Sequence, residues 1–207
     1  MSGGSYIDGK EEVCSWIREH YPDAVILDVG PGGGTWRDLL PEYKMDAVEI
    51  YAPTAEEIRH KYGAVICADI ADVSYDYDLV IFGDVIEHMD VEKAQRVLAY
   101  ARDHSKDFIV AVPWKYKQGI CYGNQWEIHI QDDLTPEIFA ERYPGMIQLW
   151  ANERYAYYHD GSREVLQLAA LAGIEESSAP ARQVHGQGRV EIRQEKRSQH
   201  SAPHLPA

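Results

Sequence analysis

Short, almost continuously apolar runs alternate with helical segments from about residue 24 to residue 113. The runs, which predict strands, cover residues 24–30, 45–50, 64–69, 77–85 and 107–113. Helices are expected before and between them, most clearly at 89–104, where apolar residues recur at helical spacing. Strands that are apolar on both faces and alternate with helices are typical of a parallel sheet covered on both sides. The sequence therefore predicts an α/β fold with a Rossmann-like, doubly wound sheet.

The pattern changes after the fifth of these strands. Residues 114–133 form a polar and aromatic stretch without periodicity, and residues 134–145 predict a short capped helix. Residues 146–161 are typical of two strands that turn near Asn152 and Glu153. The predicted sheet is thus mostly parallel and finishes in a C-terminal antiparallel hairpin.

The end of the chain differs in composition from the rest. Residues 162–173 predict one last helix, which completes a single domain over residues 1–174. Residues 175–207 are rich in Ser, Gln, Arg, His and Pro, so we expect a polar, weakly ordered tail. The basic side chains at 182–197 are interrupted by glutamates, and we interpret this stretch as solvated rather than as a binding arm.

The net charge is strongly acidic. The 207-residue chain carries a formal net charge of −14, and 45% of its residues are hydrophobic, enough for one packed core. Acidity on this scale repels phosphate backbones, so a nucleic acid is a disfavoured partner. A small neutral or cationic molecule is easier to recruit than a polyanion.

Cysteine usage and hydropathy indicate a cytoplasmic protein. Cys14, Cys67 and Cys121 are odd in number and far apart, which fits neither a disulfide framework nor a zinc site. Cys67 lies in a strand-like run and is expected to be a small core residue. No signal peptide opens the chain and no apolar run approaches the length of a membrane span, so we expect no membrane association.

Glycines crowd the end of the first predicted strand, in the stretch VILDVGPGGGTW at residues 25–36. A strand, a glycine-rich turn and a helix mark a nucleotide-type site at the carboxyl end of a parallel sheet. The dinucleotide form of this site has G-x-G-x-x-G, but Thr35 stands where its third glycine belongs, which weighs against a dehydrogenase. The pattern present is Asp28-x-Gly30-x-Gly32-x-Gly34.

Acidic residues stand at the ends of the next three predicted strands. They are Glu49, followed by Ile50; Asp69, followed by Ile70; and Asp84, in the stretch DVIEHM. An acid about 20 residues after the glycine loop can accept hydrogen bonds from both ribose hydroxyls of a nucleotide. Together with the glycine loop, these landmarks resemble the class I S-adenosylmethionine-dependent methyltransferases over residues 10–160.

The resemblance implies a cofactor and the residues that hold it. S-adenosylmethionine would be the methyl donor and S-adenosylhomocysteine the product. The glycine loop would wrap the methionine part, Glu49 would meet the ribose, and Asp69 would face the adenine amino group. The residues expected to bind the cofactor are Asp28, Gly30, Gly32, Gly34, Glu49, Ile50, Asp69, Ile70 and Asp84.

Two histidines are the candidates for catalysis. Methyl transfer from a sulfonium requires an acceptor atom aligned opposite the sulfur, and a proton on that atom calls for a base. His88 follows the fourth strand, and His129 lies in the irregular stretch that should fold over the same end of the sheet. The aromatic side chains of that stretch suit an organic acceptor. We expect O-methylation of a small organic acceptor, such as a sugar or a phenol, by in-line displacement.

A metal-assisted reaction is one alternative. Asp84, Glu87, His88 and His129 are similar to an E-x-x-E-H stretch and a later histidine that bind a divalent metal in small-RNA 2′-O-methyltransferases. Asp84 replaces the first Glu of that pattern, and the acidic net charge argues against an RNA end as substrate. The sequence therefore does not favour a metal. A methyltransferase fold kept as a non-catalytic binding or scaffold protein is the other alternative.

Overall fold

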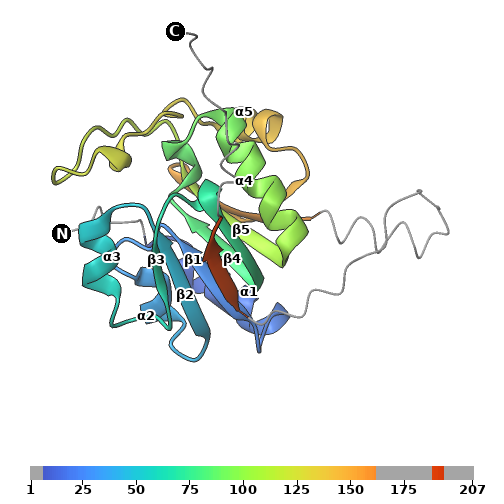
Figure 1. Ribbon diagram of the computed structural model, residues 1–207. Helices are drawn as coiled ribbons and strands as arrows, with labels where there is room; N and C mark the ends of the chain where they lie inside the picture. Colours follow the sequence, from blue (N-terminus) through green and yellow to red (C-terminus); the bar gives the residue numbers. More distant parts are fainter. Residues whose placement is uncertain (1–6, 162–187, 194–207) are drawn as a thin grey trace, which may run out of the picture.

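The computed structural model describes residues 7–161 and 188–193, which form an eight-stranded sheet with helices on both faces (Figure 1). The strands are β1 (Val25–Val29), β2 (Lys44–Glu49), β3 (Val65–Cys67), β4 (Val73–Gly83), β5 (Ser105–Pro113), β6 (Met146–Ala151), β7 (Tyr155–Asp160) and β8 (Arg189–Ile192). The α-helices are α1 (Lys10–His20), α2 (Thr35–Leu39), α3 (Ala52–Ile58), α4 (Val91–His104) and α5 (Pro136–Arg142). Short 3-10 helices are η1 (Ile70–Asp72), η2 (Ile86–His88) and η3 (Gln125–Glu127).

The strand order is β3-β2-β1-β4-β5-β7-β6, with β8 beside β4 outside this path. The first five strands pair in parallel, whereas β7 runs antiparallel to both β5 and β6. Val29 at the end of β1 lies opposite Val48 of β2 and Phe82 of β4, so these three strands end at the same edge of the sheet. The predicted α/β class, the mostly parallel sheet and the C-terminal hairpin are confirmed.

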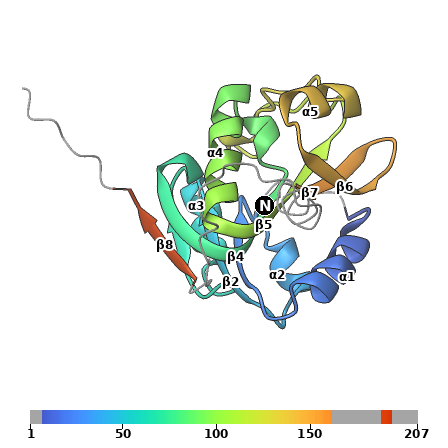
Figure 2. The same cartoon turned by 90° about the vertical axis from the view of Figure 1, so that its right-hand side faces the viewer.

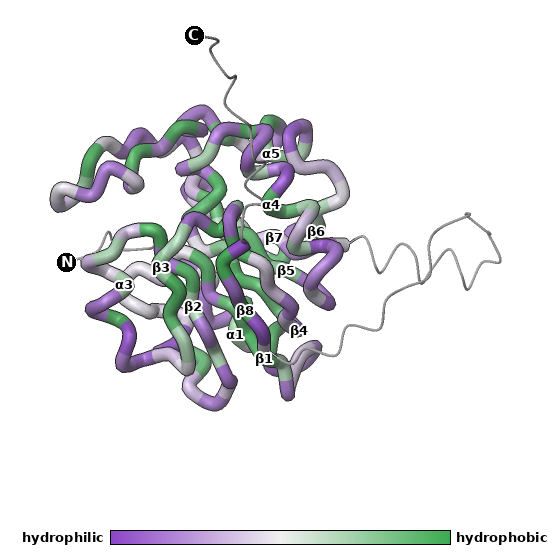
Figure 3. The backbone as a smooth tube through the Cα atoms, viewed as in Figure 1, coloured by the Kyte–Doolittle hydropathy of each residue, from purple (hydrophilic) through white to green (hydrophobic). Residues whose placement is uncertain are grey.

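Helices cover the two faces of the sheet in separate groups. One apolar cluster joins the sheet to α4 and α5, and the other joins it to α1, α2 and α3. Figure 2 shows α4 and α1 on opposite sides of the strands, and Figure 3 shows the apolar character of the central strands. Within the described part of the chain the longest helix is α4, with 14 residues. None of the helices there is both long and apolar enough to cross a membrane.

Helix α4 illustrates how the sequence builds this packing. Its buried residues are Ala94, Val97, Leu98 and Ala101, which recur at the three- and four-residue spacing of one helical face. The Asp90 side chain accepts the N–H of Lys93 at 2.7 Å and so caps the start of the helix. Helix α4 therefore begins a short distance along the chain after the carboxyl end of β4.

Two features differ from the sequence-based expectation. Strand β4 begins at Val73 instead of residue 77, because its first residues pair antiparallel with β8, a four-residue strand inside the predicted tail. Cys67 is exposed rather than part of the core, because β3 is a three-residue strand at the edge of the sheet. The predicted helix at 162–173 lies outside the described residues.

Candidate cofactor and acceptor site

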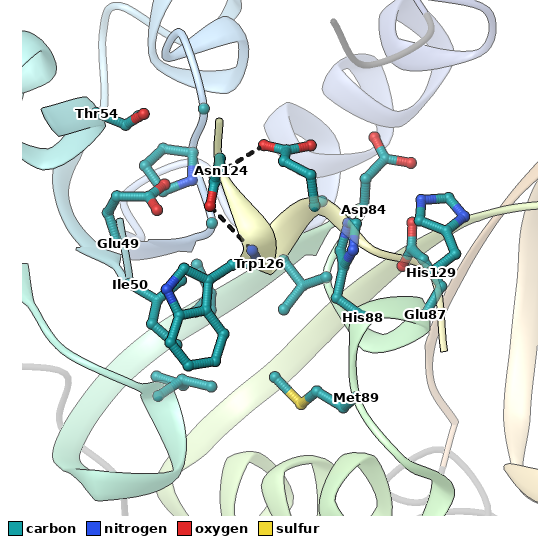
Figure 4. Close-up of a pocket in the computed structure, with 18 of the residues that line it drawn as sticks. Glu49, Ile50, Thr54, Asp84, Glu87, His88, Met89, Asn124, Trp126 and His129 are labelled. Atoms are coloured by element: carbon teal, nitrogen blue, oxygen red, sulfur yellow. Dashed lines mark hydrogen bonds between the residues drawn. The ribbon is translucent and has the colours of Figure 1, made fainter. Parts of the chain in front are cut away.

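A cavity of about 910 Å³ opens at the carboxyl ends of the parallel strands. Its walls come from the glycine loop after β1, the ends of β2, β3 and β4, the turn η2, and an arm formed by residues 114–130 (Figure 4). Ligands of open α/β sheets bind at this edge, since the loops after the strands converge there. The cavity is large enough for a nucleotide-sized molecule and a second small one.

The glycine loop forms the cavity floor in a conformation that requires glycine. Gly30 has a φ of 63° and Gly32 a φ of 53°, both in the left-handed region. A Cβ atom at Gly30 would stand 2.6 Å from Cγ2 of Val85. The Gly30 N–H donates to the carbonyl of Val48 at 2.9 Å, which ties the loop to β2. Both glycines line the cavity, and because they have no side chains a bound ligand can approach the backbone closely.

Two residues of the predicted cofactor set do not line the cavity. Asp28 is fully buried behind it, where Oδ2 accepts the Tyr62 hydroxyl at 2.7 Å and burial raises its pKa to about 7. Gly34 precedes α2 with a φ of 84°, and a Cβ there would lie 3.0 Å from the Lys61 side chain. Their positions suit shaping of the loop, and a direct contact of either residue with the cofactor stays a prediction.

Glu49 and Ile50 line the cavity at the end of β2. The Glu49 side chain is 6% exposed, and its Oε1 accepts the N–H of Tyr51 at 2.8 Å. Burial raises the pKa of this carboxyl. A buried carboxylate that still has acceptor capacity suits a pair of ribose hydroxyls.

Asp69 and Ile70 line the cavity beyond β3. The Asp69 carboxylate is already engaged, because Oδ1 accepts the N–H of Ala71 at 3.0 Å and Oδ2 forms an ion pair with Lys93. Lys93 also lines the cavity. The sequence did not suggest this ion pair, because Lys93 belongs to a helix 24 residues further along the chain.

Asp84 lines the cavity at the end of β4 in a left-handed backbone conformation, with a φ of 58°. Its Oδ1 accepts a hydrogen bond from the Tyr155 hydroxyl of β7. A non-glycine residue held at positive φ is uncommon and is typical of functional turns. The hydrogen bond to β7 holds the Asp84 carboxylate in place within the site.

The structure brings His88 and His129 together. Their rings meet edge to face, with centroids 4.6 Å apart. Nδ1 of His88 lies 3.1 Å from the carbonyl oxygen of Ile128, and Nδ1 of His129 lies 2.8 Å from that of Tyr116. A carbonyl oxygen can only accept, so each Nδ1 carries a proton and each neutral ring keeps its lone pair on Nε2. Burial lowers the pKa of both imidazoles, which favours this neutral form.

Glu87 adds a buried carboxylate to the histidine pair. The residue is 0% exposed, and both side-chain oxygens lack a hydrogen-bond partner among the described residues. Burial raises the pKa of this carboxyl well above its usual value, and the nearby Asp84 adds to the effect. Glu87, His88 and His129 each place a ligand atom within 4.8 Å of the others (Figure 4). One carboxylate and two imidazoles are a donor set that fits a divalent transition metal.

The arm places four of its polar and aromatic residues on the cavity wall: Tyr116, Asn124, Trp126 and Glu127. The Glu127 carboxylate accepts from the amides of Asn124 at 3.3 Å and Gln118 at 3.0 Å. Two other aromatic residues of this stretch lie elsewhere. Trp114 packs against Phe139 and Tyr158, and Tyr122 is 68% exposed outside the cavity lining.

Sequence reasoning missed Lys10, the first residue of α1, which also lines the cavity. Its side chain is 1% exposed, and its ammonium group lies 4.3 Å from the centroid of the Trp36 ring. Only the packing of α1 against the strand ends reveals this position, because a lysine in the first turn of an amphipathic helix carries no functional signal in the sequence.

Comparison with known proteins supports the fold assignment. No protein-family model and no curated protein sequence matches the chain. Among solved structures, the PH0226 protein of Pyrococcus horikoshii OT3 superposes with a TM-score of 0.52 and 16% identity, covering 72% of this chain and 87% of that one. Magnesium protoporphyrin IX methyltransferase of Synechocystis PCC 6803, with bound SAH, gives 0.51 and 16%, covering 77% and 89%. CalS10 of Micromonospora echinaspora, an amino pentose methyltransferase with bound SAM, gives 0.52 and 14%, covering 76% and 92%. The chain therefore has the fold of the class I S-adenosylmethionine-dependent methyltransferases.

Proposed function

We propose that this chain is an S-adenosylmethionine-dependent methyltransferase that methylates an oxygen atom of a small organic acceptor, such as a sugar or a phenol. The observation that carries the proposal is the single cavity that joins the glycine loop and Glu49 to the pair of His88 and His129. A cofactor half and an acceptor half thus share one space, as direct transfer between two bound molecules requires.

The residues of the cofactor half fit S-adenosylmethionine. Gly30 and Gly32 line the cavity without side chains, so a ligand can lie against the backbone there. Glu49 would accept the ribose hydroxyls, and Ile50 and Ile70 would contact the adenine ring, with Asp69 near its amino group. When bound, the cofactor supplies an activated methyl group on a positively charged sulfur.

The residues of the acceptor half position the nucleophile and take its proton. Neutral His88 and His129 present Nε2 lone pairs, which can accept the proton of an acceptor hydroxyl as the oxygen attacks. Trp126 and Tyr116 offer flat apolar faces to an organic ring, and Glu127 can accept a hydrogen bond from it. The likeness to CalS10, an amino pentose methyltransferase, and to magnesium protoporphyrin IX methyltransferase supports a small-molecule acceptor.

A thermal-shift series tests the cofactor. The full chain is titrated with S-adenosylmethionine, S-adenosylhomocysteine and NAD, and a ligand at 100 times its Kd should raise the unfolding free energy by about 2.7 kcal/mol. Both adenosyl ligands should raise the Tm by a few degrees, and NAD should not. A Glu49→Ala variant should lose most of the shift. A wild-type chain that responds to neither adenosyl ligand at millimolar concentration would contradict the proposal and favour a scaffold role.

The cluster of Glu87, His88 and His129 favours a second candidate, in which a divalent metal assists the transfer. Its strongest support is the buried Glu87 carboxyl group, whose oxygens have no hydrogen-bond partner among the described residues and so are available to a cation. The metal would supply a positive charge that favours the deprotonated acceptor. Equilibrium binding of Mn²⁺ and Zn²⁺ separates the candidates: stoichiometric binding that is lost in Glu87→Gln supports the metal, and transfer at full rate in a chelator supports the histidines alone.

A further inference from the structure

We propose that Lys10 is the residue that binds the carboxylate of the amino-acid end of the cofactor. The inference rests on the proposed function and adds to it a residue outside the glycine loop and the strand-end acids. Lys10 lies at the start of α1, next to Gly9. A left-handed φ of 78° at Gly9, with no space for a Cβ beside Trp150, sets the direction in which α1 begins.

The Lys10 side chain is buried, and the described part of the chain offers its ammonium group no hydrogen-bond partner. It is 1% exposed, and its Nζ makes no hydrogen bond within the described residues. The ammonium group rests on aromatic faces, 4.3 Å from the Trp36 ring centroid and 5.6 Å from that of Tyr157. Such contacts stabilise a cation but do not use its three N–H donors. Burying an ammonium group in this way is costly unless a ligand anion completes its surroundings.

Lys10 is a positively charged residue in a cavity lined mainly by carboxyl groups. Six carboxyl residues line the cavity: Glu49, Asp69, Asp84, Glu87, Asp90 and Glu127. The lysines and arginines that line it, among the described residues, are Lys10 and Lys93, and Lys93 is already paired with Asp69. An anionic group that enters this acidic cavity therefore finds its counter-charge at Lys10.

Lys10 also lies at the end of the cavity that suits the amino acid rather than the adenine. It contacts Trp36, which follows directly on the glycine loop, whereas Glu49, Asp69 and Ile70 stand at the ends of β2 and β3. Asp28 and Asp84 both act electrostatically on Lys10 and oppose the effect of burial, which lowers its pKa. Lys10 and Asp84 both line the cavity and carry opposite charges, as recognition of a carboxylate and an ammonium group on one carbon requires.

The role is tested by removing the lysine charge and the ligand carboxylate separately. Calorimetry gives Kd values for S-adenosylhomocysteine, for its decarboxylated analogue, and for 5′-methylthioadenosine, which lacks the whole amino-acid end. The proteins are the full chain, Lys10→Met, Lys10→Gln and the control Lys44→Met. Lys44 is an exposed lysine at the start of β2, at the opposite edge of the sheet.

The wild-type chain should bind S-adenosylhomocysteine about 10- to 100-fold more tightly than the decarboxylated analogue, as expected for a buried charge-assisted contact. In Lys10→Met and Lys10→Gln this ratio should fall below about threefold, while the Kd for 5′-methylthioadenosine stays within about twofold. Lys44→Met should keep the wild-type ratio. The metal-free, ligand-free Lys10→Met protein should be at least as thermally stable as the wild type, because Met packs over Trp36 without the desolvation cost of a buried ammonium group.

Two results would overturn the assignment. One is a Lys10→Met or Lys10→Gln protein that keeps the wild-type ratio between the two ligands. The other is an equal loss of affinity for all three ligands, which would give Lys10 a purely structural role under Trp36. Failure of the proposed function has a different signature, because then the wild-type chain binds none of the three adenosyl ligands.

Discussion

The backbone carbonyl of Glu87 accepts the N–H of Ile130 at 2.8 Å and joins the turn after β4 to the arm that follows β5. The N–H of Gln131 donates to the same oxygen at 2.9 Å. The buried side-chain amide of Gln131 also donates to the carbonyls of Ile86 at 2.8 Å and Met89 at 3.1 Å. These contacts hold His129, two residues before Gln131, beside Glu87 and His88.

Gln131→Leu should therefore disturb both stability and catalysis. The change removes the amide that donates to the carbonyls of Ile86 and Met89 and accepts from the buried Tyr143 hydroxyl, and we expect a loss of about 1 to 3 kcal/mol in the unfolding free energy. Methyl transfer should slow at saturating substrate, because His129 loses its position, while S-adenosylhomocysteine binds with nearly unchanged Kd. Denaturant unfolding and steady-state kinetics check the two effects. An unchanged kcat in a destabilised variant would show that the arm needs no anchor at Gln131.

The histidine pair predicts a specific loss of turnover. His88→Asn and His129→Asn should each lower kcat by about 10²- to 10⁴-fold if the rings accept the acceptor proton. The Kd for S-adenosylhomocysteine should change by less than about threefold. The exposed His60 provides the control, since His60→Asn should keep wild-type kinetics. Because burial lowers the pKa of both rings, activity should persist below pH 6.5 and fall only in more acidic solution. A rate that is independent of pH in that range would argue against a histidine base.

Replacing Glu87 with glutamine should raise the stability of the metal-free protein. Burial raises the pKa of the Glu87 carboxyl, so near neutral pH the folded chain must either protonate this group or bury its charge. Neither oxygen has a hydrogen-bond partner within the described residues. Glutamine has nearly the same shape and no charge to desolvate. Thermal unfolding after chelation measures the change, and the same variant should lose any Tm increase caused by Mn²⁺ or Zn²⁺. A lower Tm of the chelated variant would mean that the Glu87 carboxylate is satisfied in solution.

The glycine loop is tested by a pair of matched substitutions. Gly30 and Gly145 both have a left-handed φ, of 63° and 85°, so alanine introduces backbone strain at either position. At Gly30 the new Cβ also meets Val85 at 2.6 Å, whereas a Cβ at Gly145 would face open space within the described part of the chain. Gly30→Ala should therefore weaken S-adenosylhomocysteine binding by at least about tenfold. Gly145→Ala should cost about 1 kcal/mol of stability without changing that Kd. Equal Kd values in the two variants would mean that the cofactor does not approach Gly30.

Asp28 predicts a pH dependence of folding. Its pKa is raised from 3.8 to about 7 by burial, so between these values the folded chain keeps a proton that the unfolded chain releases. The contribution of Asp28 to the unfolding free energy is therefore full below pH 4 and declines as the pH rises through 7, by up to about 4 kcal/mol. Asp28→Asn keeps an acceptor for the Tyr62 hydroxyl and removes this dependence. Denaturant unfolding of the wild type and of Asp28→Asn from pH 4 to pH 8 measures the difference. The unfolding free energy of the wild type should fall relative to that of the variant as the pH rises, and parallel curves would show that the Asp28 carboxyl does not titrate.

The sequence by itself determined the class of fold and the edge of the sheet at which the candidate site lies. Continuous apolar runs can only be buried between two helical layers, so the alternation of strands and helices was sufficient to predict the sheet. Glycines after β1 and acids after β2, β3 and β4 could be located because the carboxyl ends of parallel strands share one edge. His88 and His129 were identified as candidates for the same reason.

Only the tertiary structure decided which side chains act on one another across that edge. The ion pair of Lys93 with Asp69, the hydrogen bond of Tyr155 to Asp84 and the position of Lys10 over Trp36 each join elements far apart in the chain. The exposure of Cys67 and the pairing of β8 with β4 likewise depend on which strand lies at an edge. A local sequence pattern predicts which face of a helix or strand is buried. It does not predict which residue of another element packs there, because that depends on how the elements are arranged in the folded chain.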